Sequence, residues 1–300
     1  MKLTFDLDRT GEVPLRDAAT VVLARDGAEG LEIFMLKRNM NSDFVGGAYV
    51  FPGGGVDPED RADDLGPVCA GRTDADASAR LGIDAGGLAF WTAAIRESFE
   101  EAGVLLARGA SGSHVDLDGP DAARWAEHRR AVDGGDRRLV EVCEAEGLQL
   151  AVDDLHYFGN WVTPEGSPRR YDTRFFVAAA PEGQTPLHDD HEVIANEWLR
   201  PADGLARALA GELTMLPPTM ASLRAVEPYE TVADLLAAAS AITEVPRIVP
   251  RIREVEQLVY LLLPDDPGFE GDGPFEAGDP LAWQRASGER TTGFGSVVSR

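Results

Sequence analysis

The chain has 300 residues, 44% of them hydrophobic and 27% charged, a composition typical of a soluble globular protein with one or two domains. Lys and Arg number 28 against 52 Asp and Glu, so the formal net charge is −24. This charge repels nucleic acid and anionic membranes, and no apolar run approaches the ~20 residues of a membrane helix, so both kinds of partner are excluded.

The cysteine pattern and the first residues indicate the compartment. Cys69 and Cys143 lie far apart and form no C-x-x-C motif, so a disulfide framework is not expected. The segment 1–8 lacks the apolar core of a signal peptide. We therefore expect a cytoplasmic protein.

The first third of the chain predicts short strands and an insertion. Runs 19–24 and 31–37 are β-rich, and Gly27 and Gly30 between them favour a hairpin. A third strand over 48–51 ends at the Pro52-Gly53-Gly54-Gly55 turn. Residues 56–87 have weak periodicity, and we interpret them as an insertion with one short helix.

Helices and strands then intermix without a regular βαβ alternation. This order predicts an α/β (α+β) fold, with a mixed sheet and helices packed against it. One domain is expected over 1–264, with a helical segment at about 120–147, and a loosely ordered C-terminal extension over 265–300. The expected helices are 92–102, 121–132, 137–146, 202–209, one opening at Pro217-Pro218 and 231–242; the expected strands are 156–163, 173–179, 195–199 and 255–263.

The helix over 92–102 carries a cluster of acidic residues. At about 100° per residue, Glu97, Glu100 and Glu101 share one arc, and Ile95 and Phe99 lie on the opposite side. Like charges at this spacing repel each other, and a divalent cation with hard oxygen ligands would turn the repulsion into a binding site. The alternative is a solvated acidic face, which is common in so acidic a chain.

The motifs around this helix resemble the Nudix box, G-x5-E-x7-R-E-U-x-E-E-x-G-U, in which U is a bulky apolar residue. Phe51-Pro52-Gly53-Gly54 resembles its start, and the run RESFEEAGV over 96–104 its second half, with Ser98 in place of one U. Gly54 and Arg96 lie 42 positions apart, against 14 in the family pattern. Glu59 or Asp60 lies near the place of the first glutamate, and the sequence does not decide between them.

A long insertion inside the box is similar to one Nudix branch that includes coenzyme A diphosphatases. The resemblance also rests on FVGGAYVFPGG, NWVTP and RRYDTRFF, and covers about residues 15–265. It implies an α/β/α sandwich, dependence on Mg²⁺ or Mn²⁺, and hydrolysis of a nucleoside diphosphate linked to another group. A further motif of coenzyme A-cleaving members is matched at Arg38 and Gly47, whereas its middle arginine reads Asp43.

Pyrophosphate cleavage needs neutralised phosphoryl oxygens, a deprotonated water and in-line geometry. The resemblance assigns the metal to Glu97, Glu100, Glu101 and the carbonyl of Gly54, with Glu101 the first choice for a bridging ligand. Arg96 lies one turn before Glu100 and can hold that carboxylate in a fixed rotamer.

The segment His188-Asp189-Asp190-His191-Glu192 is the candidate for a loop that supplies the general base. The resemblance leaves open which glutamate accepts the proton of water and implies that a loop glutamate is often involved, for which Glu192 is the candidate. The alternative for this segment is a solvated turn. Its two histidines lack the cysteines or the helical H-E-x-x-H spacing of a zinc site.

Four arginines are candidate substrate-binding residues: Arg38, Arg169, Arg170 and Arg174. Alternation along a strand places Arg170, Asp172 and Arg174 on one face. An arginine there could bind a phosphate through two hydrogen bonds, or it could form a cross-strand ion pair with Asp172.

The leading hypothesis is a metal-dependent pyrophosphohydrolase that converts coenzyme A or acyl-CoA to 3′,5′-ADP and (acyl-)phosphopantetheine. The alternatives are a hydrolase of ADP-ribose, NADH or another nucleotide derivative, and a nucleotide sensor without turnover. An acidic scaffold explains neither the Phe-Pro-Gly-Gly turn nor the glutamate helix. The expected partner is a small nucleotide derivative, and a homodimer is compatible with the sequence.

Overall fold

A computed structural model describes residues 13–40, 46–255, 258–264, 266 and 269. Its centre is a mixed sheet in which the strands follow the order β10-β7-β8-β1-β2-β3, with β4 paired to β1 and β9 paired to β2. The strands are β1 (Leu15–Gly27), β2 (Gly30–Arg38), β3 (Tyr49–Val50), β4 (Gly53–Gly55), β7 (His156–Val162), β8 (Arg170–Ala179), β9 (Val193–Leu199) and β10 (Arg247–Ile248).

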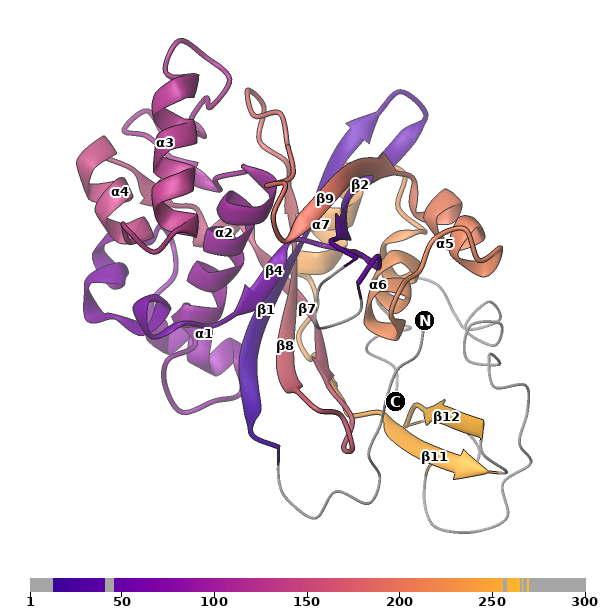
Figure 1. Cartoon of the computed structure of the whole chain (residues 1–300). Coiled ribbons are helices and arrows are strands. Elements are labelled where there is room, and N and C mark those ends of the chain that lie inside the picture. Colours follow the sequence, from indigo (N-terminus) through magenta and orange to yellow (C-terminus); the bar gives the residue numbers. More distant parts are fainter. Residues whose placement is uncertain (1–12, 41–45, 256–257, 265, 267–268, 270–300) are drawn as a thin grey trace.

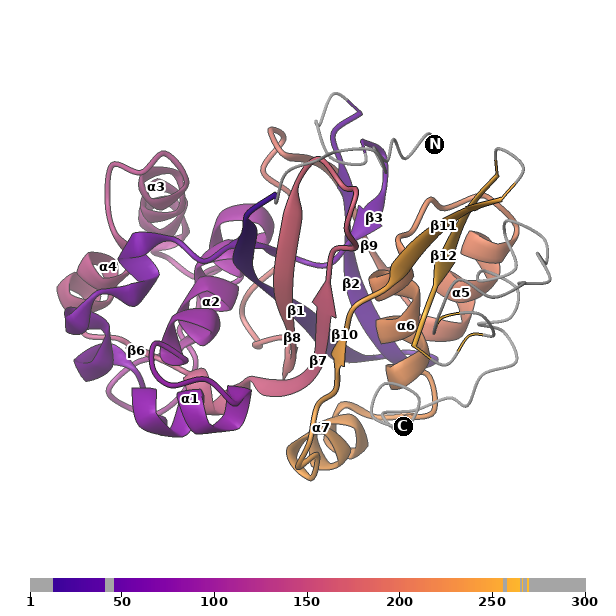
Figure 2. The ribbon, with the colours of Figure 1, turned by 90° about the horizontal axis from the view of Figure 1, so that it is seen from below.

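Helices cover both faces of this sheet, as Figures 1 and 2 show. One face packs against a hydrophobic cluster that includes Trp91 and Phe99, and the other against a cluster that includes Phe158 and Leu223. This arrangement confirms the predicted α/β/α sandwich. The helices are α1 (Asp74–Leu81), α2 (Leu88–Ala102), α3 (Ala122–Asp133), α4 (Leu139–Glu146), α5 (Pro201–Leu209), α6 (Pro217–Val226) and α7 (Val232–Ser240).

Two small sheets complete the described part of the chain. One pairs β5 (Ala107–Arg108) with β6 (Gln149–Leu150), and the other pairs β11 (Arg251–Val255) with β12 (Leu258–Leu262). The predicted strand over 255–263 is confirmed over Leu258–Leu262, whereas its antiparallel partner β11 was not predicted from the sequence. Most of the predicted extension over 265–300 lies outside the described residues, and the domain limits stay a prediction.

Strand β1 changes its neighbour along its length. Residues Ala18–Thr20 pair with β4, whereas Ala24–Gly27 pair with β2, so β1 and β2 diverge and β4 enters between them. The tight turn at the other end of the hairpin uses Gly30 at φ 114°, a conformation that favours glycine. The divergence opens the sheet at the end that carries the glycine-rich turn.

The predicted insertion over 56–87 contains α1 and two 3₁₀ helices, Pro58–Arg61 and Asp63–Val68. Helix α1 begins with a capping box between Thr73 and Asp76, which satisfies the first free N–H groups. Arg80 near its end donates to the carbonyls of Tyr157, Ile242 and Thr243 at 3.1, 2.7 and 2.8 Å. These bonds tie the segment to strand β7 and to the residues after α7.

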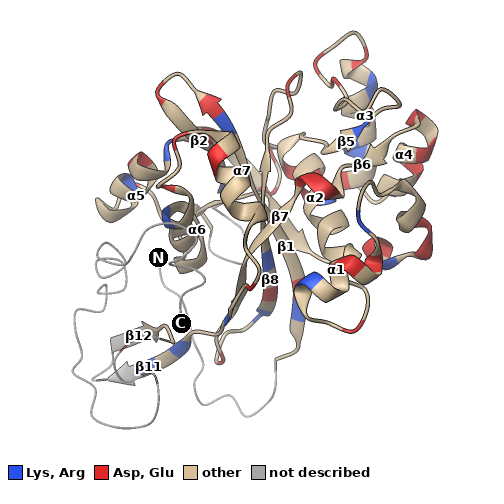
Figure 3. Ribbon diagram, turned by 180° about the vertical axis from the view of Figure 1, so that it is seen from behind, with Lys and Arg blue, Asp and Glu red and all other residues tan. Residues whose placement is uncertain are grey.

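The acidic composition is visible on the folded molecule. Acidic residues lie on several elements in Figure 3, among them α2 and α4, and the net charge is −24. No helix in the described ranges has the length and apolarity needed to cross a membrane.

Candidate active site

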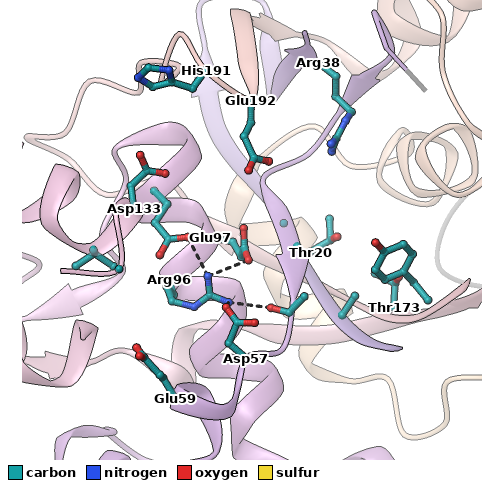
Figure 4. Close-up of a pocket in the computed structure, with 18 of the residues that line it drawn as sticks. Thr20, Arg38, Asp57, Glu59, Arg96, Glu97, Asp133, Thr173, His191 and Glu192 are labelled. Atoms are coloured by element: carbon teal, nitrogen blue, oxygen red, sulfur yellow. Dashed lines mark hydrogen bonds and ion pairs between the residues drawn. The ribbon is translucent and has the colours of Figure 1, made fainter. Parts of the chain in front are cut away.

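A cavity of about 790 Å³ opens where β1 and β2 diverge. Its walls come from β1, β4, α2, the turn between α3 and α4, the start of β8 and the loop before β9 (Figure 4). The charged residues that line it are Arg38, Asp57, Glu59, Arg96, Glu97, Glu100, Asp133, Arg137, Arg169, His191 and Glu192.

Helix α2 presents its acidic face to this cavity. Trp91 and Phe99 are buried in the core on one side, while Glu97 and Glu100 line the cavity on the other. The helix ends at Gly103, whose φ of 65° lets the last turn close with hydrogen bonds to Phe99 and Ser98. The predicted division of this helix into a core side and an acidic side is confirmed for Glu97 and Glu100, whereas Glu101 is buried and is not among the residues that line the cavity. The helix begins at Leu88 rather than at residue 92.

Arg96 is the centre of the acidic cluster and is only 8% exposed. Its Nη1 lies 2.9 Å from a carboxylate oxygen of both Glu97 and Glu100, and its Nη2 donates to the carbonyl of Gly55 at 2.8 Å. The predicted contact with Glu100 is therefore present. Burial lowers the pKa of Arg96, but the hydrogen bond to Asp60 and the surrounding carboxylates outweigh burial and raise it.

Asp60 is the residue that the sequence left undecided. It is 6% exposed and accepts from Nε and Nη2 of Arg96 at 3.1 and 2.9 Å, whereas Glu59 lines the cavity. The signal was present in the spacing, because G-x5-E counted from Gly54 falls on position 60. An aspartate can reach the guanidinium here because the 3₁₀ helix Pro58–Arg61 packs against α2.

The three glutamates are costly to ionise together. Burial is the largest cause that raises the pKa of Glu97 to about 8 and of Glu100 to about 7, against a usual value of 4.5, and Arg96 opposes both shifts. Burial and the neighbouring Glu97 raise the pKa of Glu101 strongly, although its Oε2 accepts the N–H of Gly53 at 2.9 Å. The helix therefore holds three carboxyls that favour a proton or a cation near neutral pH.

These carboxylates suit a hard divalent cation in their chemistry. Glu97 Oε2, Glu100 Oε1 and Glu101 Oε1 have no hydrogen-bond partner among the described residues, and oxygen is the donor that Mg²⁺ and Mn²⁺ prefer. As they stand, no three acidic, histidine or cysteine side chains in the described ranges converge closely enough to hold an ion. Arg96 lies between Glu97 and Glu100, and cation binding would require the free oxygens of the glutamates to turn toward one point.

The loop before β9 brings a further carboxylate, that of Glu192, to the cavity. Oδ1 of Asp189 accepts the N–H groups of His191, Glu192 and Val193 at 2.5, 2.9 and 3.2 Å. Asn39 at the end of β2 donates its N–H to the carbonyl of Glu192 at 2.8 Å. These bonds place Glu192 in the cavity (Figure 4). Its charge contributes to the raised pKa of Glu101.

The two histidines of this loop are not brought together as a metal site. His188 Nδ1 lies 2.6 Å from Oδ1 of Asn196 and its Nε2 lies 3.0 Å from Asp190, whereas His191 lines the cavity.

The candidate arginines separate into two groups. Arg38 and Arg169 line the cavity, and Arg38 lies at the same end as Glu192 in Figure 4. Arg174 is buried, pairs with Asp172 and lies over the ring of Phe90. Arg170 donates from Nε to the carbonyl of Thr163 at 3.1 Å. Neither Arg170 nor Arg174 is among the residues that line the cavity.

Sequence reasoning missed one wall of the cavity. The turn between α3 and α4 contributes Val132, Asp133, Gly135 and Arg137. No motif marks these residues, because only the packing of α3 against α2 brings them to the site.

The chain is similar to known proteins over most of its length. The family described as the NUDT19 Nudix domain matches residues 73–226. The chain is 28% identical over 313 residues to the human protein "Acyl-coenzyme A diphosphatase NUDT19", covering 89% of this chain and 84% of that protein. The chicken protein of the same name is 29% identical, over 86% and 82%. The crystal structure of a NUDIX hydrolase from Alicyclobacillus acidocaldarius has a TM-score of 0.63 and 28% identity, covering 76% of this chain and 97% of that one.

Proposed function

Because this chain belongs to the NUDT19 Nudix domain family and is a Nudix hydrolase, we propose that it cleaves the diphosphate of coenzyme A or acyl-CoA. The products are 3′,5′-ADP and phosphopantetheine or its acyl derivative. The observation that carries the proposal is the glutamate wall around Arg96 in a large polar cavity, in a chain similar to acyl-coenzyme A diphosphatases over most of its length.

We assign the cation, Mg²⁺ or Mn²⁺, to Glu97, Glu100 and Glu101, with the carbonyl of Gly54 beside them. A bound cation would neutralise charge on the diphosphate and acidify an attacking water. Arg96 would hold Glu97 and Glu100 in place through its pairing with Asp60. In this assignment Arg96 is a positioning residue.

Two further roles follow from the walls of the cavity. Glu192 would accept the proton of the attacking water, since its carboxylate lies in the cavity on the side of Glu101. Arg38 and Arg169 would bind phosphate oxygens, because guanidinium groups offer paired donors that match phosphate. We assign no phosphate contact to Arg170 or Arg174, because Arg170 bonds to the carbonyl of Thr163 and Arg174 pairs with Asp172.

A substrate panel tests the proposed function. Coenzyme A, an acyl-CoA, ADP-ribose, NADH and a dinucleoside polyphosphate are compared by kcat/KM under one set of metal conditions. We expect coenzyme A or acyl-CoA to rank first by about tenfold or more, which corresponds to about 1.4 kcal/mol of transition-state binding. Coenzyme A in last place would assign the enzyme to another nucleotide derivative.

The pKa values of the glutamates predict how stability depends on pH and metal. The pKa of Glu97 is about 8 in the folded protein, against 4.5 in the unfolded chain. Between these pH values the unfolded chain releases this proton and the folded protein does not, so ionisation favours unfolding. Without divalent cations, stability should therefore fall as pH rises from about 4.5 through about 7 and 8. A cation competes with those protons, so Mg²⁺ should raise the melting temperature more at pH 8 than at pH 6.

Thermal unfolding at several pH values, in EDTA and in Mg²⁺, checks this prediction. The variant Glu97→Gln should weaken both the pH dependence and the response to Mg²⁺. An equal Mg²⁺ shift at pH 6 and pH 8 in the unaltered protein would argue against the assigned ligands.

A further inference from the structure

The turn between α3 and α4 brings a cation to the cavity that the proposed mechanism does not use. Arg137 lines the cavity beside Asp133 and Gly135. It is partly buried, and in the part of the chain that the structure describes no carboxylate lies within ion-pair distance of it. Arg96 in the same cavity is paired with several carboxylates, and the adjacent Arg138 pairs with Asp64 at 2.7 Å.

The hydrogen-bond partner of Arg137 is the imidazole ring of His128. Its Nη1 lies 3.0 Å from Nδ1 of His128, which is 8% exposed. A guanidinium can only donate, so Nδ1 must be the acceptor and the ring proton must be on Nε2. That Nε2 lies 3.0 Å from Oε1 of Glu146, which completes the hydrogen bonds of the ring.

This chain of contacts fixes the arginine without cancelling its charge. Glu146 at the end of α4 also pairs with Arg124 at 3.2 Å, and the ring of Trp125 packs on His128 with centroids 5.5 Å apart. The buried imidazole therefore joins α3, α4 and the turn between them. Arg137 keeps its other N–H groups for a ligand in the cavity.

An anionic ligand needs such a group in this protein. The net charge is −24, and carboxylates line much of the cavity, so a phosphate can bind only where a local cation reverses the field. Arg137 comes from a different wall than the glutamates of α2. It therefore approaches a ligand from a side of the cavity other than the helix that would hold the cation.

On the basis of the proposed function, we infer that Arg137 binds a substrate phosphate remote from the scissile bond, which in coenzyme A is the 3′-phosphate. His128 is the positioning residue that aims the guanidinium, through its hydrogen bonds to Arg137 and Glu146. The pair makes the enzyme prefer coenzyme A over the analogue that lacks this phosphate.

The direct test compares coenzyme A with 3′-dephospho-CoA in the unaltered enzyme and in Arg137→Gln. Loss of a charge-assisted hydrogen bond to phosphate should lower kcat/KM for coenzyme A by about 10- to 100-fold. The loss for dephospho-CoA should be at least about tenfold smaller. Arg130→Gln is the matched control, because Arg130 is exposed on α3 and its side chain donates to the carbonyl of Ala126 in the same helix. Equal losses for both substrates, or no loss for either, would overturn the inference.

Binding of the product half separates this inference from the proposed function. Calorimetry with 3′,5′-ADP and 5′-AMP measures the contribution of the 3′-phosphate without turnover. We expect the preference for 3′,5′-ADP to shrink by about tenfold or more in Arg137→Gln. If the unaltered enzyme does not cleave coenzyme A, the proposed function fails. If Arg137→Gln keeps the full preference for 3′,5′-ADP over 5′-AMP, the contact between Arg137 and the 3′-phosphate is rejected.

Two substitutions test the positioning role of His128. His128→Leu removes the acceptor and should raise KM for coenzyme A while largely keeping kcat. His128→Asn restores an oxygen acceptor near the position of Nδ1 and should recover part of the preference over dephospho-CoA. An unchanged preference in His128→Leu, or an equal loss of kcat on both substrates, would contradict this role. If His128→Leu does not fold, the KM values of His128→Asn decide.

Discussion

Replacing Glu101 by glutamine is expected to lower kcat by about a thousandfold while the fold stays intact. Glu101 is 4% exposed and accepts the N–H of Gly53, and the amide oxygen of glutamine can keep that hydrogen bond. The substitution therefore removes the charge with little change in shape. Because burial and Glu97 raise the pKa of Glu101, the variant should be at least as stable as the unaltered protein without metal.

The same measurement on Glu100→Gln should give a loss of similar size. Steady-state rates at several Mg²⁺ concentrations distinguish weakened metal binding from loss of the chemical step. Glu127→Gln is the matched control, because Glu127 is an exposed glutamate on the neighbouring helix α3. Unchanged hydrolysis in both variants would remove the glutamates of α2 from the metal site.

Replacing Arg96 by methionine is expected to lower the free energy of unfolding by about 3–5 kcal/mol and to abolish turnover. Arg96 is 8% exposed and pairs with Asp60, Glu97 and Glu100. Its loss leaves these carboxyls without a counter-charge in a poorly solvated place. Urea denaturation measures the change in stability.

A second variant separates the structural part of this effect from the functional part. Arg96→Met combined with Asp60→Leu replaces the most deeply buried pair by apolar groups, so stability should return in part while activity should not. Arg61→Met is the control, because the half-exposed pair of Arg61 with Asp17 should contribute less than about 1 kcal/mol. An Arg96→Met variant that lost no more stability than this control would contradict the prediction.

The acidic side of the site could be predicted from the sequence because its geometry is local. The positions of Glu97, Glu100 and Glu101 on one arc, and the contact of Arg96 with Glu100, follow from the helical repeat alone. Asp60 could have been assigned from its spacing to Gly54, and the structure decides it against Glu59.

The rest of the cavity depends on tertiary packing, which the sequence does not encode locally. The alternation of side chains along β8 correctly placed Asp172 and Arg174 on one face and Thr173 on the other. Both faces of β8 are covered by other parts of the protein, so the alternation alone could not tell which face borders the cavity. Arg137 has no motif around it, and its place in the cavity depends on the packing of α3 and α4.

The hydrogen bonds of Arg80 set a limit on how much of the chain the fold requires. They close a loop from α1 to Ile242 and Thr243, across more than half of the sequence. Any fragment that stops before Ile242 loses two of the three carbonyls that bind this arginine. The conformational entropy lost when α1 becomes ordered is unchanged in such a fragment. The segment that supplies Asp60 to Arg96 is thereby anchored at its far end by residues beyond the last described helix. A truncation that removes Ile242 and Thr243 should loosen α1, well away from the glutamates themselves.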